Sequence, residues 1–392
     1  MIETEVAADS PARWRLGRAT WILLAGNALQ STGVGFFFPI LPIYALSRGA
    51  TSLEIGAMLT AGVAGAALAQ FPGGWLADRF DRRTLVVAFQ TTYALFFPLY
   101  LLPISPLWLI PLRFLHTVIS SGYQPTAMAL LADLSPIEHR GRMFGFWSSS
   151  FMFGLLVGPA VGGALALIGL QYAFWGAAGA TLMSAATLTL LPRGERRVQS
   201  RDTEPHVPAR ELIKVLAPAM LAGAGPAFGI GCYDAVWSLY IHSNGGGTFV
   251  IGLSFTLFAL PVLLFSGLAG ALSDRLGPKP VVAWSTLIMG GFASAYGFVH
   301  SIPVLLGMGV VEGSMAVGSR PALLALVSKS VPKSHQGRAQ GAYQTNTYLF
   351  QGVGALVGGA LFGFSHTYSF LAIGAACALA VTAVPFLGRR RL

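Results

Sequence analysis

Four charged side chains stand inside long apolar segments of the chain: Arg113, Asp234, Glu312 and Arg320. A charge at membrane depth costs at least about 2.5 kcal/mol on insertion scales, so each is a candidate functional group. Glu312 lies about ten residues into its segment, where a carboxyl could exchange protons near neutral pH. A fixed ion pair with Arg320, eight residues further along, is the alternative. Asp234 could be a second proton site, attract a cationic substrate, or have a purely structural partner.

His116 follows Arg113 by one helical turn, and an imidazole can titrate near neutral pH. A hydrogen-bonded structural histidine is the alternative. Polar and aromatic residues in segments expected to face the molecular centre are candidates for a substrate cavity, which would suit amphipathic organic molecules. The alternative for each single residue is packing or lipid contact. These cavity candidates are Asn27, Gln30, Gln70, Tyr123, Gln124, Trp147, Tyr233, Trp237, Tyr343, Gln344, Asn346 and Gln351.

The segments that must position these groups are membrane helices. Apolar residues make up 54% of the 392 residues and charged residues 10%, against about 25% charged in soluble domains. This composition excludes a soluble enzyme, a disordered chain and a coiled coil. Runs of about 20 apolar residues without strict alternation predict spanning helices. We expect twelve, at 19–45, 52–77, 84–104, 106–132, 142–168, 171–191, 214–241, 249–272, 280–299, 302–328, 339–364 and 367–388.

The basic residues support this count. With the N-terminus in the cytoplasm, 22 of the 25 Lys and Arg fall on the cytoplasmic side, and only Arg48 falls in an outside loop. This asymmetry is the positive-inside pattern of an inner-membrane, multi-pass protein with both termini in the cytoplasm. The net charge of +10 therefore indicates contact with anionic lipid, not binding of nucleic acid.

The chain repeats itself at an offset of 196 residues. The matching pairs are Asp78–Arg79 with Asp274–Arg275, Pro125 with Pro321, Gly141–Arg142 with Gly337–Arg338, and Gly158, Gly162 and Gly163 with Gly354, Gly358 and Gly359. This repeat predicts an all-α membrane protein of two pseudo-symmetric six-helix bundles. We expect a tail over 1–18, bundles over 19–191 and 214–388, a cytoplasmic linker over 192–213 and a tail over 389–392. Parallel halves around a midplane site are one layout of secondary transporters.

A charged loop carries a family resemblance. Residues 74–83 and their repeat at 270–279 are similar to the loop motif of the major facilitator superfamily, although Asp81 stands where that family usually has Gly. The resemblance covers nearly the whole chain and implies the same twelve-helix fold. It also implies a conformational latch that changes contacts as the halves rock; a loop that only caps helices and fixes topology is the alternative. The latch candidates are Asp78, Arg79, Arg82, Arg83, Asp274 and Arg275.

A glycine-rich string resembles the drug:proton antiporters of that superfamily. It consists of Gly154, Gly158, Pro159, Gly162 and Gly163, where small residues let helices approach closely and the proline bends the helix. Residues 39–44 are similar to another stretch of the same subfamily. The resemblance implies export of hydrophobic or amphipathic small molecules by proton antiport with alternating access, driven by a proton gradient without a cofactor.

One departure from that subfamily concerns the first segment. Many related exporters have an acidic residue there, and this chain offers only Asn27 and Gln30. Coupling must then rest on the second half, or the chain is not proton-coupled as its relatives are. The basic residue that the family has in helix 4, thought to influence proton exchange, corresponds to Arg113.

Other functions are weaker interpretations of the sequence. Proton-coupled or facilitative transport of a lipid, sugar or organic anion is the alternative within transport. A receptor or scaffold would need a further domain, and an enzyme would need a metal cluster or a nucleophile pair that the sequence lacks. No nucleotide-binding motif and no metal site are present. We expect Cys232 and Cys377 to be small core residues, and the fold to work as a monomer with membrane lipid around it.

Overall fold

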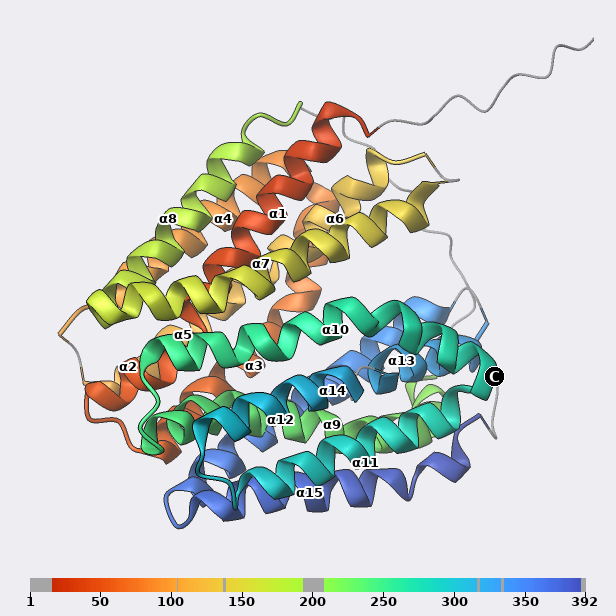
Figure 1. Ribbon diagram of the computed structural model, residues 1–392. Helices are drawn as coiled ribbons and strands as arrows, with labels where there is room; N and C mark the ends of the chain where they lie inside the picture. The colour runs from red at the N-terminus through yellow and green to blue at the C-terminus, as the bar shows by residue number, and fades with distance from the viewer. Residues whose placement is uncertain are drawn as a thin grey trace, which may run out of the picture.

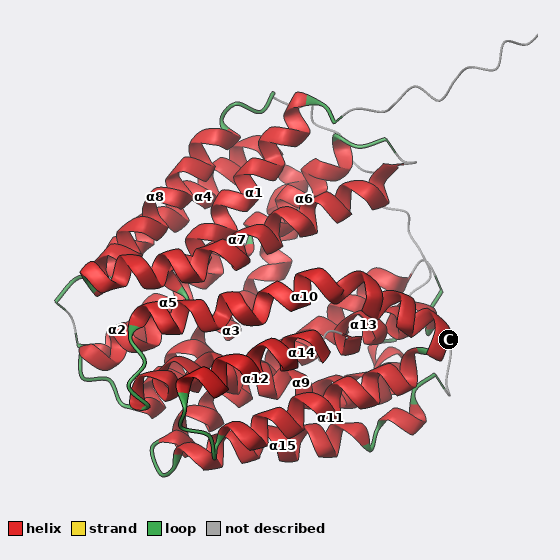
Figure 2. Cartoon of the chain, viewed as in Figure 1, coloured by secondary structure: helices red, strands yellow, loops and turns green. Residues whose placement is uncertain are grey.

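The structure is a computed structural model that describes residues 16–103, 105–136, 139–192, 208–315, 318–332 and 335–388. The side chains of 70–75, 77, 78, 209 and 266–274 lie outside this description. Within the described residues the regular structure is helical throughout (Figure 2).

Within its described residues, the first half forms the following helices in chain order. They are α1 (Arg18–Phe37), α2 (Leu41–Ser47), α3 (Ser52–Arg79), α4 (Arg82–Leu99), η1 (Pro106–Trp108), α5 (Leu109–Ser121), α6 (Tyr123–Asp133), α7 (Arg140–Ile168) and α8 (Leu170–Leu188). The second half contains α9 (Ala209–Ser243), α10 (Thr248–Leu276), α11 (Pro278–Tyr296), α12 (Ile302–Met315), α13 (Ser319–Lys329), α14 (Gln336–Phe362), α15 (His366–Val381) and η5 (Val384–Phe386).

The helix boundaries repeat at the offset found in the sequence. α3, α4, α6, α7 and α8 begin 196 residues before α10, α11, α13, α14 and α15, as Ser52 and Thr248 show for the first pair. The halves differ at their starts, because α9 runs unbroken where the first half breaks between α1 and α2. The internal repeat is thus present in the structure as well as in the residue pattern.

Each of the twelve expected segments contains helix. Within the described residues, the expected segment 19–45 is broken between α1 and α2, and the expected segment 106–132 between α5, which ends at Ser121, and α6, which begins at Tyr123. Gly122 precedes α6, and Gly318 precedes α13. A Cβ on Gly122 would overlap the Phe89 ring of α4, and one on Gly318 would lie 2.5 Å from Val281 of α11. Seven helical stretches of the described chain meet the length and apolarity needed to cross a membrane. The count of twelve crossings stays a prediction.

The charged loops start the following helices in two different ways. Asp81 is the N-cap of α4, and its carboxylate accepts hydrogen bonds from Thr84 N (2.8 Å) and Thr84 Oγ1 (2.7 Å). Gly277, 196 residues later, is the N-cap of α11 with φ +83°, a conformation that favours glycine. The family's glycine is therefore replaced in the first loop by a side-chain cap, which satisfies a free helix N–H.

The two halves meet at one end, which we call the closed end. It carries the start of α3, the start of α10, and the ends of α7 and α14. Figure 1 shows the two bundles converging there, around α2, and their ribbons diverging toward the end where the C-terminus lies. The largest buried apolar cluster lies at the closed end and takes residues from both halves, including Phe37, Phe174, Tyr240 and Phe370.

Candidate functional site

Glu312 is held by two tyrosine hydroxyls from two other helices. The residue lies near the end of α12 and is 3% exposed. Tyr296 at the end of α11 donates a hydrogen bond of 2.8 Å to Oε2, and Tyr233 of α9 donates one of 3.2 Å to Oε1. We call Tyr233 and Tyr296 the tyrosine pair. Each carboxylate oxygen therefore has a neutral donor, which offsets part of the cost of burying a charge.

Aromatic rings close around this carboxylate. The Trp237 ring centroid lies 4.9 Å from that of Tyr296 and 6.1 Å from that of Tyr233, in edge-on contacts. Its indole N–H donates to Ser254 Oγ at 2.9 Å, which fixes the ring against α10. Phe370 of α15 lies 6.1 Å from Tyr296. Because Glu312 is almost fully buried, we expect proton exchange with solvent to require movement of these rings or helices.

The structure places Arg320 away from Glu312. The Arg320 side chain is exposed on α13, and within the described part of the chain Glu312 takes part in no ion pair. The alternative of a fixed Glu312–Arg320 pair is therefore not observed in this structure.

Asp234 lies where the two halves meet. Gln351 of α14 donates a hydrogen bond of 3.0 Å to its Oδ2. The positive charge of Arg113, on α5 in the other half, acts electrostatically on the same carboxylate. The Arg113 guanidinium lies 5.3 Å from the centre of the Phe37 ring, and no described residue offers its buried Nε an acceptor. An acid from one half and a base from the other thus attract each other at the interface.

His116 is fully buried and both of its ring nitrogens are engaged. Nε2 lies 3.1 Å from the Tyr93 carbonyl, and Nδ1 lies 3.2 Å from the Tyr100 hydroxyl. A carbonyl only accepts, so Nε2 carries a hydrogen. Tyr93 and Phe96 stack on the ring, with centroids 4.2 and 5.4 Å away. This arrangement matches the alternative of a hydrogen-bonded structural histidine.

The cavity candidates fall into different environments. Asn27 is buried and donates to Trp147 O at 3.1 Å and Ser150 Oγ at 2.8 Å, so it ties α1 to α7. Asn346 donates to Met220 O at 3.0 Å and ties α14 to α9 in the same way. Buried polar groups in membrane helices commonly serve this purpose. These two amides therefore each connect two helices, and their place in a substrate cavity stays a prediction.

The remaining candidates are placed as follows. Tyr123, Trp147 and Tyr343 are buried, Gln124 is exposed, and Gln30, Tyr233, Trp237, Gln344 and Gln351 are partly buried, whereas the Gln70 side chain lies outside the described residues.

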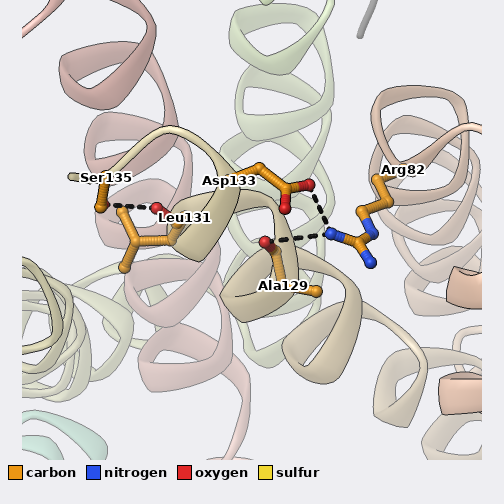
Figure 3. A network of polar contacts seen from close by, with 5 residues as sticks. All are labelled: Arg82, Ala129, Leu131, Asp133 and Ser135. Atoms are coloured by element: carbon orange, nitrogen blue, oxygen red, sulfur yellow. Dashed lines mark hydrogen bonds and ion pairs between the residues drawn. The ribbon is translucent and has the colours of Figure 1, made fainter. Parts of the chain in front are cut away.

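The latch candidates are only partly described. The side chains of Asp78 and Asp274 lie outside the described residues, and Arg79 and Arg275 are exposed. Arg82 forms an ion pair with Asp133, at the end of α6, and donates to Ala129 O at 3.3 Å; Figure 3 shows this network.

Arg83 donates to the Thr189 carbonyl, at the end of α8. Arg82 and Arg83 thus bind within the first half. Asp133 was not among the candidates, because nothing in its local sequence marks it.

The glycine string packs α7 against two helices. A Cβ on Gly158 would lie 2.7 Å from Gly35 Cα, and one on Gly162 would overlap the backbone of Phe36, both in α1. Gly154 also faces α1. A Cβ on Gly163 would lie 2.5 Å from Thr248 O of α10, in the other half. The string therefore includes packing within the first half and a contact between halves, with Pro159 next to Gly252 of α10.

Two threonine hydroxyls cross between the halves near the closed end. Thr60 of α3 donates a hydrogen bond of 2.8 Å to Gly352 O of α14. Thr256 of α10 donates one of 2.7 Å to Leu156 O of α7. The donors are 196 residues apart and so are the acceptors, so the internal repeat relates the two bonds. We call them the threonine bonds. The repeat offset pairs Thr60 with Thr256 in the sequence, but their acceptors required the structure.

Comparisons with known proteins agree with this architecture. The family model of the Major Facilitator Superfamily matches residues 23–232 and 219–391. The chain is 24% identical to Multidrug resistance protein 2 of Bacillus subtilis, over 90% of this chain and 91% of the relative. It is 28% identical to the multi-drug resistance efflux pump PmrA of Streptococcus pneumoniae, over 88% and 89%.

A crystal structure of a mutant of the nucleoside transporter NupG has the same fold, with a TM-score of 0.78 at 15% identity, over 95% of this chain and 100% of that one. The family model spans both halves, from the first helix to the last. The chain belongs to the Major Facilitator Superfamily and is a multi-pass membrane transporter, not an enzyme.

Proposed function

We propose that the chain is a secondary active transporter that exports hydrophobic or amphipathic small molecules by proton antiport with alternating access. The observation that carries this proposal is Glu312, a buried carboxyl with two hydroxyl donors. Such a group can hold a proton or release it without losing all of its partners. The relatives named as multidrug proteins support the substrate class.

In the proposed cycle, the two acids of the second half carry protons and the halves alternate around them. Asp234 attracts Arg113 of the other half only while it is ionised. Protonation of Asp234 therefore weakens the attraction between halves and favours their separation. Glu312 lies among the aromatic rings and is reached when the helices move. The proton gradient supplies the energy, so no cofactor is needed.

The orientation and cellular setting are part of the same proposal. We place both termini in the cytoplasm and the chain in the inner membrane, working as a monomer. The 22 basic residues on the terminal side of the predicted topology support this orientation. The structure then has its closed end on the outer side, and transport requires that end to open. Arg82 and Arg83, bound within the first half, lie on the cytoplasmic side, where a latch between the halves would act.

One observation favours a second candidate function. Arg113 presents a buried Nε for which no described residue provides an acceptor. A carboxylate or other organic anion would satisfy this guanidinium directly. Proton-coupled or facilitative movement of an organic anion is therefore the alternative to the export of neutral or cationic amphiphiles.

The test measures substrate-driven proton movement in proteoliposomes. We would compare the wild type with Glu312→Gln under an imposed pH gradient, across lipophilic cations, neutral amphiphiles and organic anions. Glu211→Gln, an exposed carboxyl paired with Lys214 at the start of α9, is the matched control. We expect coupled proton flux in the wild type and the control, and its loss in Glu312→Gln. Substrate movement that ignores the gradient in the wild type overturns antiport; flux driven only by anions selects the second candidate.

A further inference from the structure

The site that Glu312 forms with the tyrosine pair has a counterpart in the first half. Tyr100 and Tyr296 are 196 residues apart, and so are Tyr44 and Tyr240. The Tyr44 hydroxyl donates to the Tyr100 carbonyl at 2.8 Å, and the Tyr240 hydroxyl donates to the Tyr296 carbonyl at 2.8 Å. Both halves thus use the same scaffold to fix a tyrosine at the same place, and any difference around it is specific to one half.

The titratable partner of that tyrosine differs between the halves. The position of Glu312 is taken in the first half by His116, which meets the Tyr100 hydroxyl. The position of Tyr233 is taken by Phe37, whose ring centroid lies 5.9 Å from that of His116. The acid and a second hydroxyl therefore occur together in the second half, and the imidazole and a plain phenyl ring occur together in the first.

The number of acceptor atoms explains this pairing. One nitrogen of His116 is taken by the Tyr93 carbonyl, so a single tyrosine hydroxyl completes the ring. A carboxylate has two oxygens, and Tyr296 reaches only one of those of Glu312. We propose that Tyr233 is the positioning residue of Glu312, whose hydroxyl stabilises the ionised carboxylate and links its protonation to α9. This inference rests on the proposed function, in which Glu312 carries the proton.

The geometry shows how the link would act. On protonation one carboxyl oxygen gains an O–H donor and becomes a weaker acceptor, so we expect the tyrosine bond to that oxygen to reverse. The Tyr233 bond is the longer one, at 3.2 Å against 2.8 Å, and is therefore the one that changes. Tyr233 precedes Asp234 in α9, and Gln351 of α14 holds Asp234. A change at Glu312 is thus passed to the residue next to the second acid.

The other groups around Glu312 cannot replace this hydroxyl. Cys377 of α15 is a buried titratable group that acts on Glu312 only through space. α10 packs against the turn that follows Glu312 through the Phe258 carbonyl and Pro261, close to Gly313. Ser254 of α10 is occupied by the Trp237 indole. Within the described residues, Tyr233 and Tyr296 are the hydrogen-bond donors to this carboxylate.

The test follows the carboxyl itself by infrared difference spectroscopy of the full chain in lipid. The C=O band present in the wild type and absent in Glu312→Gln is assigned to protonated Glu312. In Tyr233→Phe we expect this band at a higher frequency, because the protonated carboxyl loses the Tyr233 hydroxyl as the acceptor of its O–H hydrogen bond. We also expect the pH of half-protonation to move upward by about one unit, because the ionised form loses a donor.

Tyr44→Phe is the matched control, since it removes a buried hydroxyl from the equivalent scaffold of the first half. We expect it to leave the band and its titration unchanged. An unchanged band and midpoint in Tyr233→Phe, in a variant that folds, overturns the inference. The outcome is separable from the proposed function: a shifted band without any coupled proton flux in the wild type retains the role of Tyr233 at Glu312 and overturns antiport alone.

Discussion

The threonine bonds provide a quantitative prediction about the closed end. Thr60→Val and Thr256→Val replace each hydroxyl by a methyl group and remove one side-chain hydrogen bond between α3 and α14 and one between α10 and α7. The backbone acceptors keep the option of bonding within their own helices. The loss therefore measures the two bonds with little change in packing. We expect the double variant to favour separation of the halves at this end.

The magnitude follows from measured hydrogen bonds between membrane helices, which average about 0.6 kcal/mol and reach about 1.7. Thr60 also donates to Gly56 O at 2.8 Å in its own helix, so its bond to Gly352 shares one hydrogen and belongs near the average. Two bonds at the average give roughly 1.2 kcal/mol, which changes the ratio of closed to open molecules roughly eightfold. Each single variant should change it roughly threefold.

Pulsed electron paramagnetic resonance between spin labels on the two halves measures this ratio. Leu107 of η1 and Phe298, after α11, are 57% and 66% exposed and suit labelling as cysteines. Cys232 and Cys377 are buried, so the native thiols are protected from the label.

Thr345→Val is the matched control, because that hydroxyl is exposed and bonds only within α14, to Gly341 O at 3.0 Å. Identical distance distributions in the wild type and the double variant would refute the reasoning, as would an equal shift in the control.

Two further predictions concern packing and the cytoplasmic ion pair. Gly252→Ala should reduce transport at least about tenfold, because its Cβ would overlap the Pro159 carbonyl of the other half; Gly291→Ala, with open space around it, should transport normally in the same vesicle assay. Asp133→Asn should lower the free energy of unfolding in detergent by less than about 1 kcal/mol, because its ion pair with Arg82 is partly exposed. A larger loss would contradict this expectation and show that the ion pair holds α4 and α6 together.

The fold was largely predictable because its signals are local or periodic. The bilayer requires long apolar runs and places basic residues on one side, so both can be recognised without the structure. The 196-residue repeat can be found by comparing the sequence with itself. The breaks between α1 and α2 and between α5 and α6 were not predicted, because a membrane segment keeps its apolar character through them. At Asp81 the sequence predicted only a difference from the family's usual glycine, not a helix cap. Its mechanism, a side chain in place of a left-handed glycine, required the geometry of Thr84.

The site was predictable in its charged members and not in their partners. Glu312 and Asp234 stand out because a charge in an apolar segment is costly. Tyr296 passed unnoticed, because a tyrosine at a helix end is ordinary in a membrane protein. The predicted partner Arg320 is exposed on α13, and no ion pair joins it to Glu312 within the described residues. The hydrogen-bond partners of the two acids come from helices that are distant in sequence. The internal repeat, which aligns Tyr100 with Tyr296, is the one sequence signal that singles out Tyr296.

The comparison of the halves bears on where coupling resides. The first segment offers only the amides Asn27 and Gln30, which do not titrate near neutral pH, and Asn27 binds α7. The position equivalent to Glu312 holds His116, with both nitrogens engaged in a site closed by stacked rings. One scaffold therefore carries a fixed imidazole in one half and an acid with two hydroxyl donors in the other. We infer that the first half provides the static side of the cycle, and that proton exchange rests on the acids of the second half.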